Sequence, residues 1–198
     1  MSQTISEAIK QDHREIFGYY DEYLRAKEQR DTDAQARWAR QLTWEVARHS
    51  AGEELVVYPL FEKYMGDEGK NMADEDRADH QKVKELLYHF ESLSAGSPEY
   101  DDTLARVVAE LRTHISAEES QDLPALESHL SPEESREVAT SFSRTKMLVP
   151  TRAHPSAPDK PPFETLAGLM AAPMDKLKDA LSKFPTAEMR QEAATHGN

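Results

Sequence analysis

The stretch "RHSAGEEL" (residues 48–55) decides the fold, because it places His49 and Glu53 one turn apart in a segment that otherwise has the pattern of a half-buried helix. Residues four positions apart lie on the same face of an α-helix. Val46 and Val57 flank the pair on this face. A buried carboxylate is costly unless it is paired or bound to a metal ion. The pair therefore needs a partner inside the protein.

A second stretch, "RTHISAEE" (residues 112–119), repeats this spacing with His114 and Glu118. Leu104 and Leu111 precede it at helical spacing, which predicts that this segment is also an amphipathic helix. Two separate helices are therefore expected to direct a His–Glu pair toward the core.

Apolar side chains recur at three- and four-residue steps, and this periodicity predicts long amphipathic helices. We expect them at residues 6–29, 32–64 and 74–93, and from about residue 104 to a bend or end at Pro124. Pro59 should kink the second helix, because it has no N–H for the helical ladder. Residues 66–76 and 94–102 are expected to be connections. Short connections favour antiparallel neighbours, so the predicted fold class is all-α, an up-down-up-down four-helix bundle.

A short fifth helix is predicted to follow the bundle. Ser131 is its expected N-cap, Pro132 its first residue and Glu134 the acid that completes a capping box, and the helix should end near Lys146. We therefore assign residues 1–148 to one domain, a metal-binding bundle.

Residues 149–198 are predicted to form an extension that docks on the bundle. Prolines between residues 150 and 162 predict a semi-extended linker. A small amphipathic helix is expected after Pro173, and about the last twelve residues of the chain are expected to be frayed. The apolar side chains expected to dock are Met174, Leu177, Leu181 and Phe184.

The composition excludes several classes of function. The chain has 24 basic and 37 acidic residues, a formal net charge of −13, which disfavours nucleic acid and membranes as partners because both are negatively charged. It has no cysteine, so disulfides, thiolate catalysis and cysteine-based zinc sites are excluded. The N-terminal sequence has no signal-peptide layout, and we expect a cytoplasmic protein.

Histidine is the residue type that points to a site. Each of the four long helices carries one on its apolar face, and two of these histidines have a glutamate one turn later. A single histidine of this kind is usually a core residue bonded to a carbonyl group. Buried imidazoles and carboxylates that converge from four helices instead favour a dinuclear metal site. The candidate ligands are His13, His49, Glu53, His80, His114 and Glu118.

His13, "HSAGE" (residues 49–53), His80 and "HISAE" (residues 114–118), in this order, resemble the hemerythrin-like, or HHE cation-binding, family over about residues 5–130. The resemblance implies an up-down-up-down bundle around a non-haem di-iron centre. The cofactor it implies is two iron ions, joined by an oxo or hydroxo bridge and by two carboxylates. Zinc or manganese would also suit imidazole and carboxylate ligands.

The resemblance also implies roles for the candidate ligands. His13 and His49 would bind one iron, His80 and His114 the other, and Glu53 would bridge the two. The second bridging acid is left open. Oxygen-carrying members favour the position of Glu119, five residues after the histidine, whereas helix geometry favours Glu118 because four residues return to the same face.

One further position differs from the oxygen carriers. They place a second histidine four residues after the histidine of helix three, and this chain has Lys84 there. Lys84 is expected either to turn outward with its stem along the bundle or to act as a donor toward the centre. Reversible oxygen carriage is therefore a weaker expectation than metal binding.

Three functions follow from these residues. The first is a di-iron protein that binds or senses dioxygen, nitric oxide or iron. The second is a di-iron enzyme with catalase-like or peroxidase-like activity on hydrogen peroxide. The third is a metal-free helical interaction module whose histidines are structural. A small diatomic ligand or peroxide is the expected partner in the first two cases.

Overall fold

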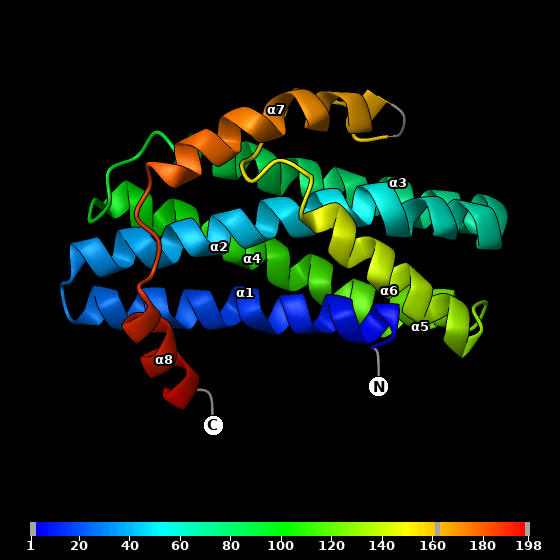
Figure 1. Cartoon of the computed structure of the whole chain (residues 1–198), viewed down its shortest axis with the longest axis horizontal. Coiled ribbons are helices and arrows are strands. Elements are labelled where there is room, and N and C mark those ends of the chain that lie inside the picture. Colours follow the sequence, from blue (N-terminus) through cyan, green and yellow to red (C-terminus); the bar gives the residue numbers. More distant parts are fainter. Residues whose placement is uncertain (1–2, 161–162, 197–198) are drawn as a thin grey trace.

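The computed structural model describes residues 3–160 and 163–196. These residues form helices and connections, with no strand among them. Figure 1 shows the arrangement of the helices. In chain order they are α1 (Ile5–Glu28), α2 (Thr32–Gly52), η1 (Glu53–Val57), α3 (Tyr58–Phe90), α4 (Pro98–Ala117), η2 (Glu118–Asp122), α5 (Leu123–Glu127), α6 (Pro132–Lys146), α7 (Phe163–Ala180) and α8 (Ala187–His196).

The four long helices α1 to α4 lie roughly along the long axis of the molecule (Figure 1). α1 packs along α2, and α3 along α4, while further contacts join α1 to α4 and α2 to α3. Each of these helices therefore has one face toward a shared interior. α6 crosses one end of this group and contacts α1, α2 and η1.

Local sequence signals fix where these helices begin. Thr4 caps α1 through a capping box with Glu7, and Ser97 caps α4 by accepting a hydrogen bond from the backbone N–H of Tyr100. The predicted fifth helix is confirmed as α6, with Ser131 and Glu134 in a reciprocal capping box. Each such cap is worth about 1 kcal/mol to the helix that it starts.

The apolar core is divided into two clusters. The first contains Ile16, Leu42, Val46, Leu104 and Leu111, and the second contains Ile5, Ile9, Val57, Phe61 and Leu123. Along α1, His13 lies between Ile9 of the second cluster and Ile16 of the first. The candidate ligands therefore occupy a polar layer between two apolar layers, each of which excludes water from it.

The prediction of a connection over residues 66–76 is wrong. The chain reverses at a single residue, Gly66, and the residues after it are helical. Gly66 has φ 59° and ψ −131°, and helical residues stand on both sides of it within α3. Positive φ is readily adopted by glycine. The two limbs pack so closely that a Cβ built on Gly69 would lie 2.0 Å from the carbonyl oxygen of Phe61. The glycines therefore give a tighter turn than the polar composition indicated.

The connection predicted over residues 94–102 is too long. α4 begins at Pro98, whereas the connection was expected to continue to residue 102. Proline is favoured in the first turn of a helix, because its missing N–H would have no partner there. Acidic Glu99 and Asp101 in the same turn favour the helix start as well.

The two prolines near the candidate glutamates stand beside π-helical turns. η1 begins at Glu53 and η2 at Glu118, and a proline follows six residues after each, Pro59 and Pro124. A proline cannot donate to the carbonyl four residues earlier and its ring crowds that carbonyl. A wider turn relieves this crowding, so we attribute both π turns to the prolines. Such turns are frequent at functional sites.

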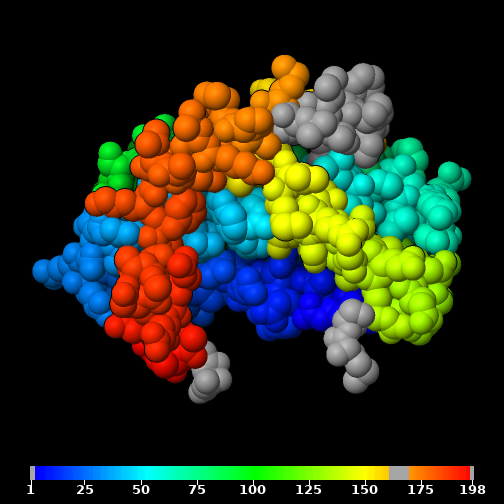
Figure 2. Space-filling model, in the orientation of Figure 1, coloured from blue at the N-terminus to red at the C-terminus, as the bar shows by residue number. Residues whose placement is uncertain are grey.

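The extension contains more helix than predicted. α7 begins at Phe163, so Pro173 lies inside it and not before it, and residues 187–196, expected to fray, form α8. The end of the predicted linker, residues 161–162, lies outside the described residues, as do residues 197–198. Figure 2 shows α8 and the segment before it lying across α1 and α2, whereas the orange part of α7 lies along the upper edge of the molecule in this view.

Contacts within the extension hold α7 against the linker, and contacts of Phe184 attach the extension to α2. The buried carboxylate of Asp175 accepts hydrogen bonds from Nε2 of His154 (2.9 Å) and from the backbone N–H of Thr151 (3.2 Å). The guanidinium of Arg37 donates to the carbonyl oxygen of Phe184 (2.9 Å), whose ring packs against Trp44.

The other apolar side chains expected to dock do not. Met174 and Leu177 are each 57 % exposed, and Leu181 is 84 % exposed. Met170, in the preceding turn, is exposed as well. α7 instead turns Ala172 and Asp175 inward. The polar anchors fix this orientation and leave an apolar stripe on the outer face.

Among the described residues, none of the helices combines the length and the apolar character that crossing a membrane requires.

Replacing Gly69 by Ala should destabilise the protein, because the new methyl group would collide with the Phe61 backbone. We expect a loss of about 1–3 kcal/mol in the free energy of unfolding, measured by denaturant titration. Gly18→Ala is the control: its Cβ meets nothing within 4 Å. That change should be neutral or add about 0.5–1 kcal/mol. Equal effects of the two substitutions would contradict the close packing of the limbs of α3.

Candidate metal centre

Four imidazoles converge in the polar layer, one from each long helix. His13 comes from α1, His49 from α2, His80 from α3 and His114 from the last turn of α4, and none is more than 4 % exposed. Their Nε2 atoms face one another in pairs. The distance is 3.1 Å between His13 and His49 and 3.2 Å between His80 and His114.

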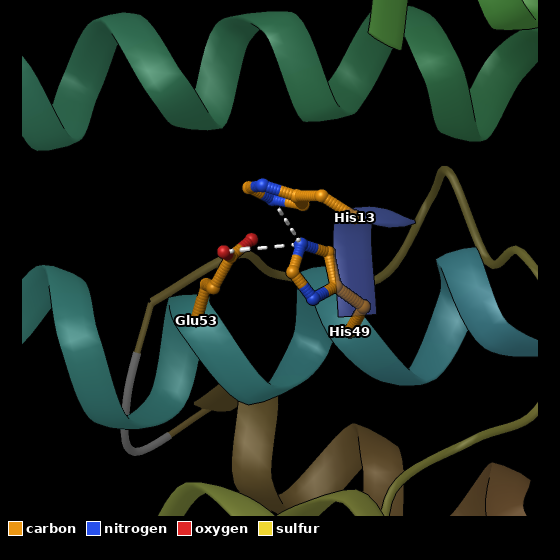
Figure 3. A group of neighbouring side chains, drawn as sticks. All are labelled: His13, His49 and Glu53. Carbon is orange, nitrogen blue, oxygen red and sulfur yellow. Dashed lines mark hydrogen bonds and ion pairs between the residues drawn. The ribbon is translucent and has the colours of Figure 1, made fainter. Parts of the chain in front are cut away.

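Glu53 lies between the two pairs. Its Oε1 is 3.1 Å from Nε2 of His49, and its Oε2 is 3.4 Å from Nε2 of His80. Figure 3 shows Glu53 and His13 turned toward the ring of His49. Two triplets of buried residues with donor atoms within 4.8 Å of one another contain Glu53, one with His13 and His49 and the other with His80 and His114.

Glu118 is the second acid of the interior. It is fully buried at the start of η2, and its Oε2 lies 3.4 Å from Nε2 of His13. The neighbouring Glu119 has a side chain that is 34 % exposed and contacts the other nitrogen of His13, Nδ1, at 2.7 Å. Of the two acids that the sequence left open, Glu118 thus faces the Nε2 atoms and Glu119 approaches from the outside.

A carboxylate stands behind every imidazole. A carboxylate that accepts a hydrogen bond from Nδ1–H leaves the lone pair of Nε2 free to bind a metal ion. This arrangement orients metal-binding histidines in many proteins. Nδ1 lies within hydrogen-bond distance of a carboxylate oxygen in three pairs, His13–Glu119 (2.7 Å), His49–Asp12 (3.2 Å) and His80–Glu54 (2.9 Å), whereas in the fourth pair, His114–Asp76, the two atoms are 3.5 Å apart.

Two lysines extend this arrangement outward. Lys84 donates to Oε2 of Glu54 at 2.6 Å, so it neither turns fully into solvent nor reaches the centre. Burial opposes ionisation of Glu54, yet the contacts with His80 and Lys84 bring its pKa to about 2. Lys146 of α6 is buried and binds the carboxylates of both Asp12 and Glu45. Each lysine thus helps to hold one imidazole through one carboxylate.

The interior groups fit a bound cation. Both carboxylate oxygens of Glu53 and of Glu118 are buried and have no hydrogen-bond partner among the described residues. Burial, followed by repulsion from Glu118, raises the pKa of Glu53 well above its usual value. Burial, followed by the charge of His80, lowers the pKa of His114 to about 4. Without a cation the site therefore holds unpaired acceptors, and a metal ion would satisfy them.

One hydroxyl group also reaches this layer. Oη of Tyr58 lies 3.1 Å from Nε2 of His80, the same nitrogen that faces His114. Burial raises the pKa of Tyr58 well above its usual value, and the charge of Glu53 adds to this effect. The phenol therefore keeps its proton and can donate a hydrogen bond.

Sequence reasoning did not identify the carboxylates that hold His49, His80 and His114. Asp12 directly precedes His13, Glu54 directly follows Glu53, and Asp76 is one turn before His80. A search for one acid beside or one turn from each ligand would have found them. Lys146 could not be found in this way, because 134 positions separate it from Asp12.

Replacing Lys146 by Met should leave the buried carboxylates of Asp12 and Glu45 without their cation. Breaking a buried ion pair in this way costs about 3–5 kcal/mol of unfolding free energy. Arg144→Met, at an exposed position of the same helix, should cost under about 0.5 kcal/mol. Denaturant unfolding at neutral pH measures both. A Lys146 variant as stable as the Arg144 variant would show that this network is unimportant.

Comparisons with known proteins agree with this geometry. Residues 4–126 match the family model described as the hemerythrin HHE cation binding domain. An uncharacterized hemerythrin-like protein of Schizosaccharomyces pombe is 54 % identical over 181 residues, which are 91 % of this chain and 88 % of that protein. No solved structure matches the chain significantly. The chain thus belongs to the hemerythrin HHE cation-binding domain family.

Proposed function

We propose that this protein binds two iron ions and uses them to bind or sense dioxygen, nitric oxide or iron itself, in an up-down-up-down bundle. The observation that carries the proposal is the position of Glu53, which belongs to both triplets of possible ligands. A carboxylate shared by two sets of imidazoles suits two neighbouring cations better than one.

In this proposal the interior groups hold the metal and the outer groups orient them. His13 and His49 serve one ion, His80 and His114 the other, and Glu53 and Glu118 are shared. Glu119, Asp12, Glu54 and Asp76 keep each Nε2 lone pair directed inward. Iron bound by imidazoles and carboxylates would supply a redox-active Lewis acid for a small ligand.

Lys84 bears on which small-molecule chemistry is available. Its ammonium group is engaged with Glu54, so α3 supplies His80 as its imidazole and no second one at this position. One set of ligands is thus poorer in nitrogen than in the oxygen-carrying members of the family. We therefore place binding or sensing before bulk oxygen transport.

The proposal predicts the metal content of the purified protein. Expressed with ample iron, it should hold about two iron ions per chain, and its near-ultraviolet absorbance should change between air and nitrogen. Chelation should lower the melting temperature, because a ligand present at about 100 times its Kd stabilises the folded state by about 2.7 kcal/mol. Zinc or manganese in place of iron would contradict the assignment of iron but would leave the proposed two-metal site intact.

Two histidines of α3 provide a matched pair of variants for this prediction. His80→Ala should lower the metal content by about one ion per chain, because it removes a ligand from the interior. His89→Ala should leave it unchanged, because the side chain of His89 is 51 % exposed and pairs with Glu99. Equal metal content in the two variants, or a colourless, metal-free wild type, would refute the proposal.

The alternative function is turnover of hydrogen peroxide, and Tyr58 is the observation that favours it. Its protonated hydroxyl lies beside Nε2 of His80 in a layer from which water is excluded. A hydrogen-bond donor placed there could stabilise the negative charge that develops on a departing oxygen atom of the substrate. Fixed donors of this kind contribute about a hundredfold or more to the rate.

This alternative is tested by oxygen release from peroxide. If the protein is catalase-like, Glu53→Ala should abolish the release and Tyr58→Phe should slow it by about a hundredfold. Tyr88→Phe is the matched control, because Tyr88 lies on the exposed face of α3. Release that persists in the Glu53 variant would assign the activity to loosely bound metal, and equal rates in the two tyrosine variants would rule out a role for Tyr58.

A further inference from the structure

A partly open cavity of about 370 Å³ lies beside the candidate metal centre, between α2, α3 and the residues from Ser141 to Pro158. Its walls come from α2, η1, α3, α6 and the linker that follows α6. Most of the lining side chains are apolar, including Val46, Leu55, Val83, Leu87, Val149 and Ala157. The hydroxyl-bearing residues Ser50, Ser141 and Thr145 complete its wall.

The outer wall of this cavity belongs to a part of the chain that the family model does not cover. The match to the family model ends at residue 126. The lining residues from α6 and the linker lie between residues 141 and 158. The linker is held in place, because Ala153 is buried against the first core cluster and the carbonyl oxygen of Pro155 accepts from Gln81 of α3 (3.1 Å). Figure 1 shows this segment passing from α6 over α2 and α3.

The charged groups of the wall are already paired with one another or with neighbours. Lys84 binds Glu54, whose other oxygen contacts His80. His154 binds Asp175 (2.9 Å), and Arg152 binds Asp179 (3.2 Å). A charged ligand would have to break one of these pairs and would leave the displaced group without its partner, which is costly.

We propose that this cavity is a binding site for a neutral, mainly apolar organic molecule with one or two hydrogen-bonding oxygen atoms. An apolar cavity of about 150 Å³ holds one benzene molecule. The present cavity therefore has room for a molecule about twice that size, comparable to a substituted naphthalene. The apolar walls supply the binding energy, and the hydroxyl groups of Ser141 and Thr145 are suited to a carbonyl or hydroxyl oxygen.

Such a molecule would lie against Glu54, the carboxylate that holds the ring of His80. The site thus adjoins the metal centre through a single side chain. The inference does not depend on the metal or on the proposed function, because it rests on the shape, lining and paired charges of the cavity. The stripe on α7 formed by Met170, Met174, Leu177 and Leu181 is the competing apolar surface.

The experiment is a titration of the full-length protein with prodan, a neutral naphthalene dye whose emission shifts to the blue in apolar surroundings. We expect saturation at about one dye per chain. Ser141→Phe and Ala157→Phe, which fill the cavity from α6 and from the linker, should each weaken binding about tenfold, equivalent to about 1.4 kcal/mol. Ser143→Phe adds the same ring to α6 away from the lining and should leave binding within about twofold.

Leu177→Ser removes part of the competing surface and should also leave binding unchanged. Loss of binding in this variant, with retention in the two filling variants, would assign the dye to α7 and overturn the proposal. Failure of the folded wild type to bind the dye would overturn it as well. Circular dichroism checks the fold of each variant. If Ser141→Phe in α6 fails to fold, Ala157→Phe still tests the proposal, because the Ala157 substitution alters only the linker.

Discussion

The structure depends on one constraint: two buried carboxylates, Glu53 and Glu118, face imidazole nitrogens in a layer that water does not reach. Such groups oppose folding unless something satisfies them. The rest of the bundle is arranged around this layer. The two apolar clusters close it from both sides along the helix axes, and π-helical turns begin at both glutamates. A bound cation would convert the constraint into a stabilising contact, because it would replace the water that these groups lose on folding.

The arrangement continues outward in successive polar contacts. A carboxylate stands behind each imidazole, and Lys84 and Lys146 stand behind two of those carboxylates. Lys146 comes from α6, beyond the region that the family model matches. The helix appended to the bundle therefore takes part in orienting His49, through Asp12. The same helix and the linker after it form the outer wall of the cavity beside Glu54. Residues after the family domain thus contribute to the centre and to its surroundings.

The sequence predicts which histidines and glutamates converge in the polar layer, because the relevant information is local. A histidine and a glutamate four residues apart must share a helix face, and Glu118 faces the interior while Glu119 does not, as that spacing requires. The all-helical fold and the capping box of α6 follow from local rules in the same way. The turn at Gly66 and the start of α4 at Pro98 differ from the prediction, because backbone geometry and not polar composition sets both positions. The burial of Lys146 and the outward stripe of α7 depend on contacts between distant segments, which no local pattern encodes.

The account is tested most directly by a crystal structure of the iron-loaded protein, with anomalous scattering measured at the iron absorption edge. We predict two anomalous peaks in the polar layer, one near the Nε2 atoms of His13 and His49 and one near those of His80 and His114, with Glu53 contacting both. Peaks confined to surface carboxylates, or an ordered polar layer that holds only water, would contradict the claim that metal ions compensate the buried acids.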